Sequence, residues 1–464
     1  MTGIVEREAA VIRAPHDGSD VGVVRLASPD DVRAALDAAV RAGAACRNMP
    51  AHERAAALRK VADGLAAART ELARTLALEA GKSINQARLE LDRAVAVFRD
   101  GAEEATRIGG EVLPADAVPA GNGRLALTRR FPLSPIVGIT PFNYPVLLAA
   151  HKIAPAMACG AAIVVKPPPQ DPLTSIRLGE IIAATGYPAG AVSIVPCHVN
   201  VAQILIEDPR VRMISFTGSA RAGWAIRAKA GSKRVALELG GNAAVIVEAD
   251  ADVELAATRC AAGGFNYSGQ SCISTQRIFV HESILRRFLD LMIPKVQAMK
   301  VGDVLDEQTE IGPLISAEAA ARVEMWIAEA KAGGAKVATG GTRRGGYITP
   351  TVLLDTTPQM KVNCEEVFAP LVTVTPYRDL AQAIAWVNDS PYGLQAGVFT
   401  SNLKTMFRCH AELDVGGVNG NDIPGFRVDR LPYGGSKESG LGREGVRYTI
   451  AEMTELRLLT LKLD

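Results

Sequence analysis

Three side chains in this sequence carry groups that could act together in acyl chemistry. Cys272 lies in Gly269-Gln-Ser-Cys-Ile-Ser, among small residues that leave the backbone approachable, and its reactivity depends on thiolate formation. Glu238 ends an apolar run just before two glycines, where partial loss of water raises a carboxyl pKa toward that of a general base. Asn143 lies in Thr140-Pro-Phe-Asn-Tyr-Pro, a stiff segment from which an amide can donate to an oxyanion.

Each of these residues alone also has an ordinary structural explanation. Free cysteines are usually buried and inert, strand-end glutamates commonly form ion pairs, and asparagine is frequent in turns. Two further segments indicate ligand binding. Lys166 ends an apolar run, and α/β sheets bind ligands at the carboxyl ends of their strands. Thr217-Gly-Ser opens a helix and presents free N–H groups to a phosphate, although the GxGxxG fingerprint is absent.

Seven sequence blocks connect these residues, in one order along the chain. They are Thr140-Pro-Phe-Asn-Tyr-Pro, Val164-Val-Lys-Pro-Pro, Phe216-Thr-Gly-Ser, Leu237-Glu-Leu-Gly-Gly, Gly269-Gln-Ser-Cys, Glu366-Val-Phe-Ala-Pro and Pro432-Tyr-Gly-Gly-Ser-Lys-Glu-Ser-Gly-Leu-Gly-Arg-Glu. With them, the sequence resembles the aldehyde dehydrogenase superfamily over nearly its whole length. The spacing between Glu238 and Cys272 also resembles that of the family.

The resemblance implies a role for each matching residue. Cys272 corresponds to the nucleophile, Glu238 to the general base and Asn143 to the oxyanion donor. Lys166 corresponds to the lysine that holds the adenosine ribose, and Glu366 to the glutamate that holds the nicotinamide ribose, with Phe368 beside it. The remaining cofactor-site candidates are Thr140, Pro141, Phe142, Pro169, Gly218, Ser219, Gly223 and Leu239.

The cofactor implied by the resemblance is NAD or NADP. NAD-preferring members often carry a glutamate three residues after the lysine, where it grips the ribose hydroxyls. This sequence has Pro169 at that position. Without the acid a 2′-phosphate is not repelled, so both cofactors remain open.

The expected reaction is oxidation of a small polar or anionic aldehyde to its carboxylate, through a cysteine thioester hydrolysed by a glutamate-activated water. The blocks are most similar to lactaldehyde, non-phosphorylating glyceraldehyde-3-phosphate and succinic semialdehyde dehydrogenases. Arg277, Arg427 and Arg430 are candidate anion contacts, although an ion-pairing or surface role is the favoured interpretation of each. The alternatives are a CoA-acylating dehydrogenase, which typically lacks the base, and a catalytically inactive binding protein.

The elements that must position these residues alternate between short apolar runs and helical stretches, the pattern of βαβ units and a parallel sheet. Helices are predicted over 30–44, 53–80 and 85–107. Strands are predicted over 136–139, 161–165, 192–195, 213–216, 234–239 and 243–247, with helices at 173–185, 201–207 and 220–230. This pattern predicts an α/β fold class, and the resemblance implies a Rossmann-like cofactor domain, an α/β catalytic domain and a small β arm for oligomerisation.

The predicted boundaries are 1–110 and 130–240 for the dinucleotide-binding domain, 241–440 for the catalytic domain, and 111–129 with 441–464 for the arm. Leucine-rich residues 456–463 form a strand-like end to the chain. Unpaired strands of this kind aggregate unless a partner covers them. A homodimer or homotetramer is therefore expected.

Composition excludes several other classes of protein. The chain has 464 residues and a formal net charge of +1, so no global field favours nucleic acid or an anionic membrane. Seven cysteines without a CxxC pair and six scattered histidines give no basis for a disulfide scaffold or a metal site. The acidic start Met1–Glu8 is unlike a secretory leader. The apolar region 136–165 is too interrupted to span a bilayer. A cytoplasmic protein is expected.

Overall fold

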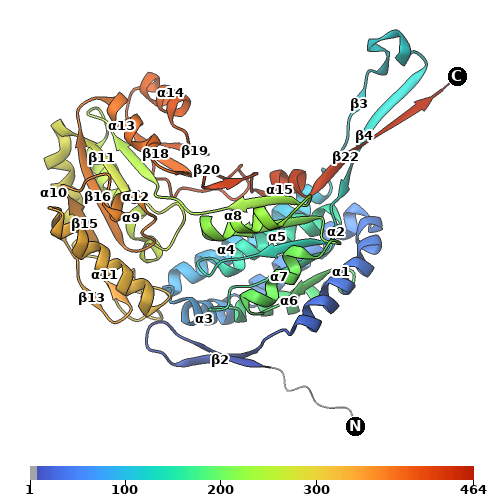
Figure 1. Cartoon of the computed structure of the whole chain (residues 1–464), viewed down its shortest axis with the longest axis horizontal. Helices are drawn as coiled ribbons and strands as arrows, with labels where there is room; N and C mark the ends of the chain where they lie inside the picture. Colours follow the sequence, from blue (N-terminus) through green and yellow to red (C-terminus); the bar gives the residue numbers. More distant parts are fainter. Residues whose placement is uncertain (1–7, 464) are drawn as a thin grey trace.

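Residues 8–463 of the computed structural model form two α/β bodies, each built on its own sheet, and a narrow arm that projects from the first (Figure 1). The parallel sheets confirm the predicted fold class. A hairpin of β1 (Ala9–Arg13) and β2 (Asp20–Arg25) precedes the first body. Residues 1–7, on which most of the leader argument rests, lie outside the described residues.

The first sheet has the strand order β21-β9-β8-β5-β6-β7. From β5 the chain moves outward to β6 and β7, then returns to the other side of β5 with β8 and β9. The strand order therefore reverses beside β5, and α/β sheets bind ligands at the carboxyl ends of strands at such a point. The strands are β5 (Ile136–Ile139), β6 (Ile163–Lys166), β7 (Val192–Ile194), β8 (Met213–Thr217) and β9 (Arg234–Glu238), all parallel, with antiparallel β21 (Gly440–Leu441) at the edge.

Helices rich in alanine and leucine pack around this sheet. The first begins at a capping box, in which Ser28 and Asp31 each accept the other's main-chain N–H, and it starts with Pro29. The predicted helix 53–80 is two helices, because the chain turns at Ala68. The helices are α1 (Pro29–Asn48), α2 (Ala51–Ala67), α3 (Arg69–Ala80), α4 (Ile84–Ala105), α5 (Pro145–Cys159), α6 (Leu173–Ala183), α7 (Val199–Glu207), α8 (Ala220–Lys229) and α15 (Val446–Glu452).

The second sheet has the order β12-β15-β16-β11-β10-β18-β19, with only β12 antiparallel to its neighbour. Its strands are β10 (Ala244–Val247), β11 (Arg277–His281), β12 (Lys336–Thr339), β15 (Thr351–Leu354), β16 (Leu371–Tyr377), β18 (Gln395–Phe399) and β19 (Gly417–Gly420). The larger helices of this body are α9 (Val253–Phe265), α10 (Leu285–Gln297), α11 (Ala317–Ala332), α13 (Leu380–Asn388) and α14 (Leu403–Glu412).

The chain crosses between the sheets at Gly240-Gly241, which follow β9 and precede β10. It crosses back after β20 (Ser436–Lys437), which pairs with β17 (Tyr392–Gly393), to enter β21. Fully buried Ser439 joins the two crossings. Its hydroxyl donates to the Gly240 carbonyl at 2.7 Å, and its own carbonyl accepts the Leu239 N–H at 2.9 Å.

The arm is a three-stranded antiparallel sheet of β3 (Val112–Leu113), β4 (Arg124–Pro132) and β22 (Thr454–Lys462), and it stands away from both bodies (Figure 1). β22 pairs with β4 over its whole length and leaves its other edge open. The predicted arm also included residues 441–453. In the structure α15 occupies most of this segment and packs on α4 and α5, so the arm strand begins at Thr454.

Within residues 8–463, no helix combines the length and hydropathy that a membrane crossing requires. The same residues gather no group of three or more His, Cys, Asp or Glu side chains that could hold a metal ion.

Candidate active site

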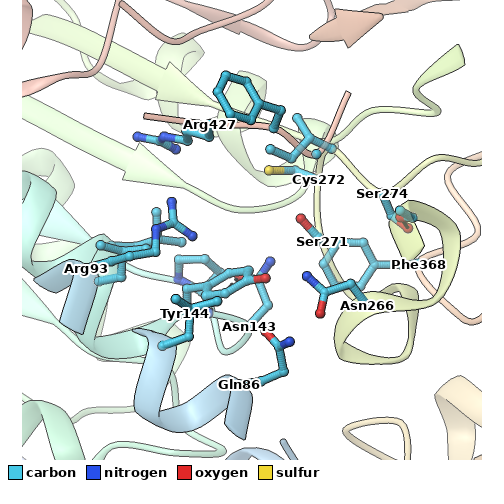
Figure 2. Close-up of a pocket in the computed structure, with 18 of the residues that line it drawn as sticks. Gln86, Arg93, Asn143, Tyr144, Asn266, Ser271, Cys272, Ser274, Phe368 and Arg427 are labelled. Atoms are coloured by element: carbon cyan, nitrogen blue, oxygen red, sulfur yellow. Dashed lines mark hydrogen bonds between the residues drawn. The ribbon is translucent and has the colours of Figure 1, made fainter. Parts of the chain in front are cut away.

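A cavity of about 1030 Å³ lies between the two bodies. The carboxyl ends of β5, β8 and β9 approach it from the first sheet, and the loops that lead into β10 and β11 approach it from the second. Figure 2 shows Cys272 and Arg427 across this space from Asn143 and Tyr144, with Arg93 and Phe368 to either side. Cys272, Glu238 and Asn143, far apart in the sequence, all line it.

Cys272 precedes β11 and is partly buried. The turn before it has an unusual backbone, because Tyr267, Ser268 and Gly269 all have positive φ. A Cβ on Gly269 would lie 2.0 Å from the Ala369 carbonyl oxygen, so only glycine fits there. Burial raises the pKa of the Cys272 thiol to about 11. The Tyr433 hydroxyl, 3.0 Å from Sγ, opposes that rise.

Asn143 is buried in the loop between β5 and α5 and is fixed on both sides. Its Nδ2 donates to the Gln270 carbonyl at 3.0 Å, and its Oδ1 accepts the Tyr144 N–H at 3.1 Å. Behind it, the buried Lys82 ammonium donates to the Asn143 carbonyl at 2.7 Å and pairs with Glu90. The amide therefore lies against the loop that carries the nucleophile.

Glu238 ends β9 and is 8% exposed. Its Oε2 has no hydrogen-bond partner among the described residues. Burial raises the pKa of Glu238 well above its usual range, and the neighbouring Glu444 adds to the rise. Burial also opposes ionisation of Glu444, but His151, Arg427 and Lys152 outweigh it and hold that pKa down at about 2. One carboxyl of the pair is thus ready to accept a proton and the other stays charged.

Glu366 reaches the cavity beside the crossing at Gly240. Its Oε1 accepts the Gly241 N–H at 3.0 Å, and burial raises its pKa to about 7. Phe368, with φ of 53°, packs edge-on against Phe142 with ring centroids 5.8 Å apart. These residues form one wall of the cavity.

The predicted cofactor residues separate into two groups. Those that line the cavity are Pro141, Phe142, Gly218, Ser219, Leu239, Glu366 and Phe368. Thr140, Lys166, Pro169 and Gly223 do not line it. Thr140 and Lys166 are joined by a 3.2 Å main-chain hydrogen bond at the ends of adjacent strands, and Pro169 is exposed just beyond them. Gly223 packs against Leu239 inside α8.

These residues fit a dinucleotide. Ser219 caps α8 and accepts the Ala222 N–H, and the free N–H groups and dipole at the start of a helix favour an anion such as a phosphate. Lys166 is buried at the end of β6, where loss of water lowers its pKa. A phosphate near the α8 terminus and a ribose near Lys166 would each find complementary groups, and Glu366 offers a carboxylate to a second ribose.

Arg427 belongs to a charged cluster at the cavity, and sequence reasoning missed its other members Arg93, Asp429 and His151. Arg93 of α4 donates through two nitrogens to Asp429 at 2.9 and 2.8 Å. Arg427 pairs with Glu444 at 2.5 Å and with Asp429 at 3.4 Å. His151 lies 3.1 Å from Asp429 and is fully buried. No sequence motif surrounds Arg93, so only the folded structure, in which α4 brings this residue to the cavity, identifies it as part of the site.

The three arginines singled out as anion contacts differ in position. Arg427 lines the cavity. Arg430 lies at the rim, half-exposed, and pairs with Asp100 and Glu103. Arg277 is buried away from the cavity and donates to the carbonyls of Asn242, Trp386 and Val387. Arg430 therefore has the surface, ion-pairing role that sequence reasoning favoured, whereas Arg277 is neither at the surface nor in an ion pair among those found within residues 8–463, and instead holds main-chain carbonyls.

Comparisons with known proteins identify the family of the chain. The model of the aldehyde dehydrogenase family matches residues 5–459. The chain is 42% identical over 441 residues to 3-sulfolactaldehyde dehydrogenase of Priestia aryabhattai, covering 95% of this chain and 92% of that protein.

Two solved structures have the same fold. Aldehyde dehydrogenase 21 from Physcomitrella patens, in complex with the reaction product succinate, has a TM-score of 0.97 and 39% identity, covering 99% of this chain and 96% of that one. Glyceraldehyde-3-phosphate dehydrogenase GapN from Methanocaldococcus jannaschii, complexed with NADP, has a TM-score of 0.95 and 36% identity, covering 99% and 100%. The family model that matches nearly the whole chain, together with relatives of this identity and coverage, shows that the chain belongs to the aldehyde dehydrogenase family.

Proposed function

We propose that this protein oxidises a short polar or anionic aldehyde to its carboxylate with NAD or NADP. The observation that carries the proposal is the meeting of Cys272, Glu238, Asn143 and Glu366 around one cavity. Their roles as nucleophile, base, oxyanion donor and ribose contact are part of the proposal.

The reaction begins at the Cys272 sulfur. The thiolate attacks the carbonyl carbon, and the carbonyl oxygen becomes an oxyanion. The Asn143 amide turns from the Gln270 carbonyl to that oxyanion, helped by the main-chain N–H of Cys272. Removing one such donor typically costs about 10²–10³ in rate. A bound nicotinamide would supply the acceptor for the hydride that leaves the tetrahedral carbon, and Cys272 would then carry an acyl thioester.

Glu238 then acts on water. Its unpartnered Oε2 accepts a proton as the water oxygen attacks the thioester carbon, and the C–S bond breaks with its electron pair returning to sulfur. The raised pKa of Glu238 makes it a stronger base toward the attacking water than an ordinary carboxylate. The charge of Glu444 favours the protonated form of Glu238, whereas Arg427 and Lys152 favour release of the proton.

Arg93 and Arg427 support an anionic group on the substrate, because both guanidinium groups line the cavity that holds Cys272. Both are held by Asp429, so their positions are fixed before the substrate arrives. Two relatives are consistent with this chemistry, one named for a sulfonated hydroxyaldehyde and one solved with a dicarboxylate product.

A kinetic screen tests the proposal. The purified chain is mixed with NAD or NADP and with pairs of short aldehydes that differ only in an anionic end group, and reduced cofactor is measured by absorbance. We expect turnover with both members of a pair and a lower KM for the anionic one. Absence of reduced cofactor with every aldehyde would refute the enzyme proposal and favour a binding protein.

The same screen with CoA distinguishes the runner-up reaction. A CoA-acylating enzyme forms an acyl-CoA and stalls without CoA. We expect free carboxylate and no dependence on CoA, because Glu238 lies at the cavity where water is to be activated.

We also propose that the arm joins subunits, in a homodimer or homotetramer. Leu456, Leu458, Leu459 and Leu461 are exposed on both faces of β22, and its free edge can accept another strand. The boundaries 1–110 with 130–240 and 241–440 remain our proposed domain division, and a cytoplasmic location our expectation. Light scattering tests the assembly, and a strictly monomeric species at micromolar concentration would contradict it.

A further inference from the structure

Tyr433 contacts the nucleophile, yet the reaction described above gives it no role. Its hydroxyl oxygen lies 3.0 Å from Cys272 Sγ. The side chain is buried, and within residues 8–463 the sulfur is the hydroxyl's hydrogen-bond partner. Buried hydroxyls are nearly always hydrogen-bonded. The phenol is therefore committed to the sulfur in this structure.

The surroundings of Tyr433 hold this hydroxyl in place. Its main chain exchanges two hydrogen bonds with Glu444, at 3.0 and 2.6 Å. The Arg427 guanidinium carbon lies 3.8 Å from the centroid of the Tyr433 ring. Arg427 is itself paired with Glu444. A cation stacked on the ring is attracted to its π-face and draws electron density from the phenol, which makes the O–H a stronger donor.

We propose that the Tyr433 hydroxyl donates its hydrogen bond to the Cys272 thiolate and thereby sets the reactivity of the nucleophile. The proposal rests on Cys272 being that nucleophile. A thiolate has no proton, so the hydroxyl must be the donor once the sulfur is charged. In this structure the Asn143 amide donates to the Gln270 carbonyl, whereas the Tyr433 hydroxyl is the group hydrogen-bonded to the sulfur.

The bond would act at both ends of the reaction. It favours the thiolate before attack, and it favours departure of the sulfur when the thioester is hydrolysed and the C–S electron pair returns to Sγ. In between, the sulfur is bonded to the acyl carbon and is a weak acceptor. At that stage the Tyr433 hydroxyl is free to contact the acyl group or the attacking water.

Tyr433→Phe tests the proposal, because it removes one oxygen atom and leaves the ring for Arg427 to stack on. Losing a hydrogen bond to a charged group raises the thiol pKa by about one unit. That lowers the thiolate fraction about tenfold at neutral pH. A more basic thiolate is roughly threefold more nucleophilic. We therefore expect Cys272 alkylation by iodoacetamide to be about threefold slower at neutral pH.

The pH dependence distinguishes this effect from a loosened pocket. The deficit in alkylation rate should shrink as the pH approaches the thiol pKa, since both proteins then carry the thiolate. Glu366, Glu238 and Arg427 also face the sulfur, but they are present in both proteins and leave the ratio of rates unaffected. Peptide mass spectrometry follows Cys272 apart from the other six cysteines.

Tyr144→Phe is the matched control, because Tyr144 lines the same cavity and its hydroxyl bonds to Ser271 instead of the sulfur. Its alkylation profile should match the wild type. Tyr433→His keeps a donor and should recover part of the rate, and it replaces the Phe variant if that variant melts early. Equal profiles for wild type and Tyr433→Phe, or faster alkylation at every pH, would overturn the proposal.

Failure of the catalytic assignment is recognised separately. Alkylation is measured without cofactor or aldehyde, so it reports the sulfur alone. If Cys272→Ala retained turnover, the nucleophile would lie elsewhere, whatever Tyr433 does. If Cys272→Ala is inactive and Tyr433→Phe leaves alkylation unchanged, only the role of Tyr433 is lost.

Discussion

Adding one methyl group at Gly240 should weaken cofactor binding without touching any residue that reacts. A Cβ there would lie 2.4 Å from Glu366 Oε2 and 2.9 Å from Oε1, closer than real Cβ atoms approach other atoms. The backbone at Gly240 does not have positive φ, so alanine itself is not strained. The carboxylate must therefore move away from the crossing and from the Gly241 N–H that it accepts at 3.0 Å.

The size of the effect follows from the bond that is lost. A hydrogen bond to a charged group contributes about 1.5–3 kcal/mol. At about 1.4 kcal/mol per tenfold change, the Kd of the cofactor should rise roughly ten- to a hundredfold. Alkylation of Cys272 without cofactor should stay within about twofold, because Glu366 is one of several groups that influence the sulfur.

Isothermal titration with NADP and NAD measures the effect directly. Gly109→Ala is the matched control, because its nearest neighbour is the Arg107 carbonyl at 4.0 Å and its φ is not positive. That variant should bind like the wild type.

A double-mutant cycle provides the decisive comparison. If Gly240→Ala acts through Glu366, it should add little to the loss already caused by Glu366→Ala. An unchanged Kd in the single variant, or fully additive losses in the pair, would refute the reasoning.

Three further results are expected. Glu238→Gln should stall hydrolysis and leave an acyl adduct on Cys272 visible by mass spectrometry; normal turnover would place the base elsewhere. Pro169→Glu should lower the NADP-to-NAD ratio of kcat/KM at least about tenfold, since like charges repel; an unchanged ratio would contradict contact there. Because the carboxylate of Glu366, with a pKa of about 7, must accept ribose hydroxyls, cofactor affinity should fall below that pH, and Glu366→Gln should abolish the dependence.

Much of the first body could be predicted from the sequence, because its strands are short apolar runs bounded by turn residues. β5, β7, β8 and β9 fall within two residues of their predicted ends. The break at Ala68 could not be predicted, since neither glycine nor proline interrupts the helical pattern there. The glycines at 240 and 241 predicted a link between two strands, but periodicity does not show that those strands belong to different sheets.

The site likewise contains residues that the sequence predicts and residues that it does not. Residues at strand ends and in glycine-rich turns leave local patterns, and Cys272, Glu238 and Asn143 were found through them. Arg93 and Lys82 lie in or beside regular helices, where the sequence does not distinguish a single basic residue of the site from an ordinary solvent-exposed one. Tyr433 lies within one of the family blocks, but nothing along the chain predicts its contact with a sulfur 161 residues away.

The two hydrogen bonds by which Ser439 joins the crossings between the bodies limit how the enzyme can open. The chain passes between the bodies at only two places within residues 8–463, and Ser439 bonds them side by side. Two adjacent tethers act as a door hinge, allowing rotation about one axis and resisting sliding. Glu238 adjoins this axis, and so does Cys272, whose carbonyl oxygen would lie 2.9 Å from a Cβ on Gly241. Points beside an axis move least, so cofactor could enter and leave at the far rim while nucleophile and base keep their separation.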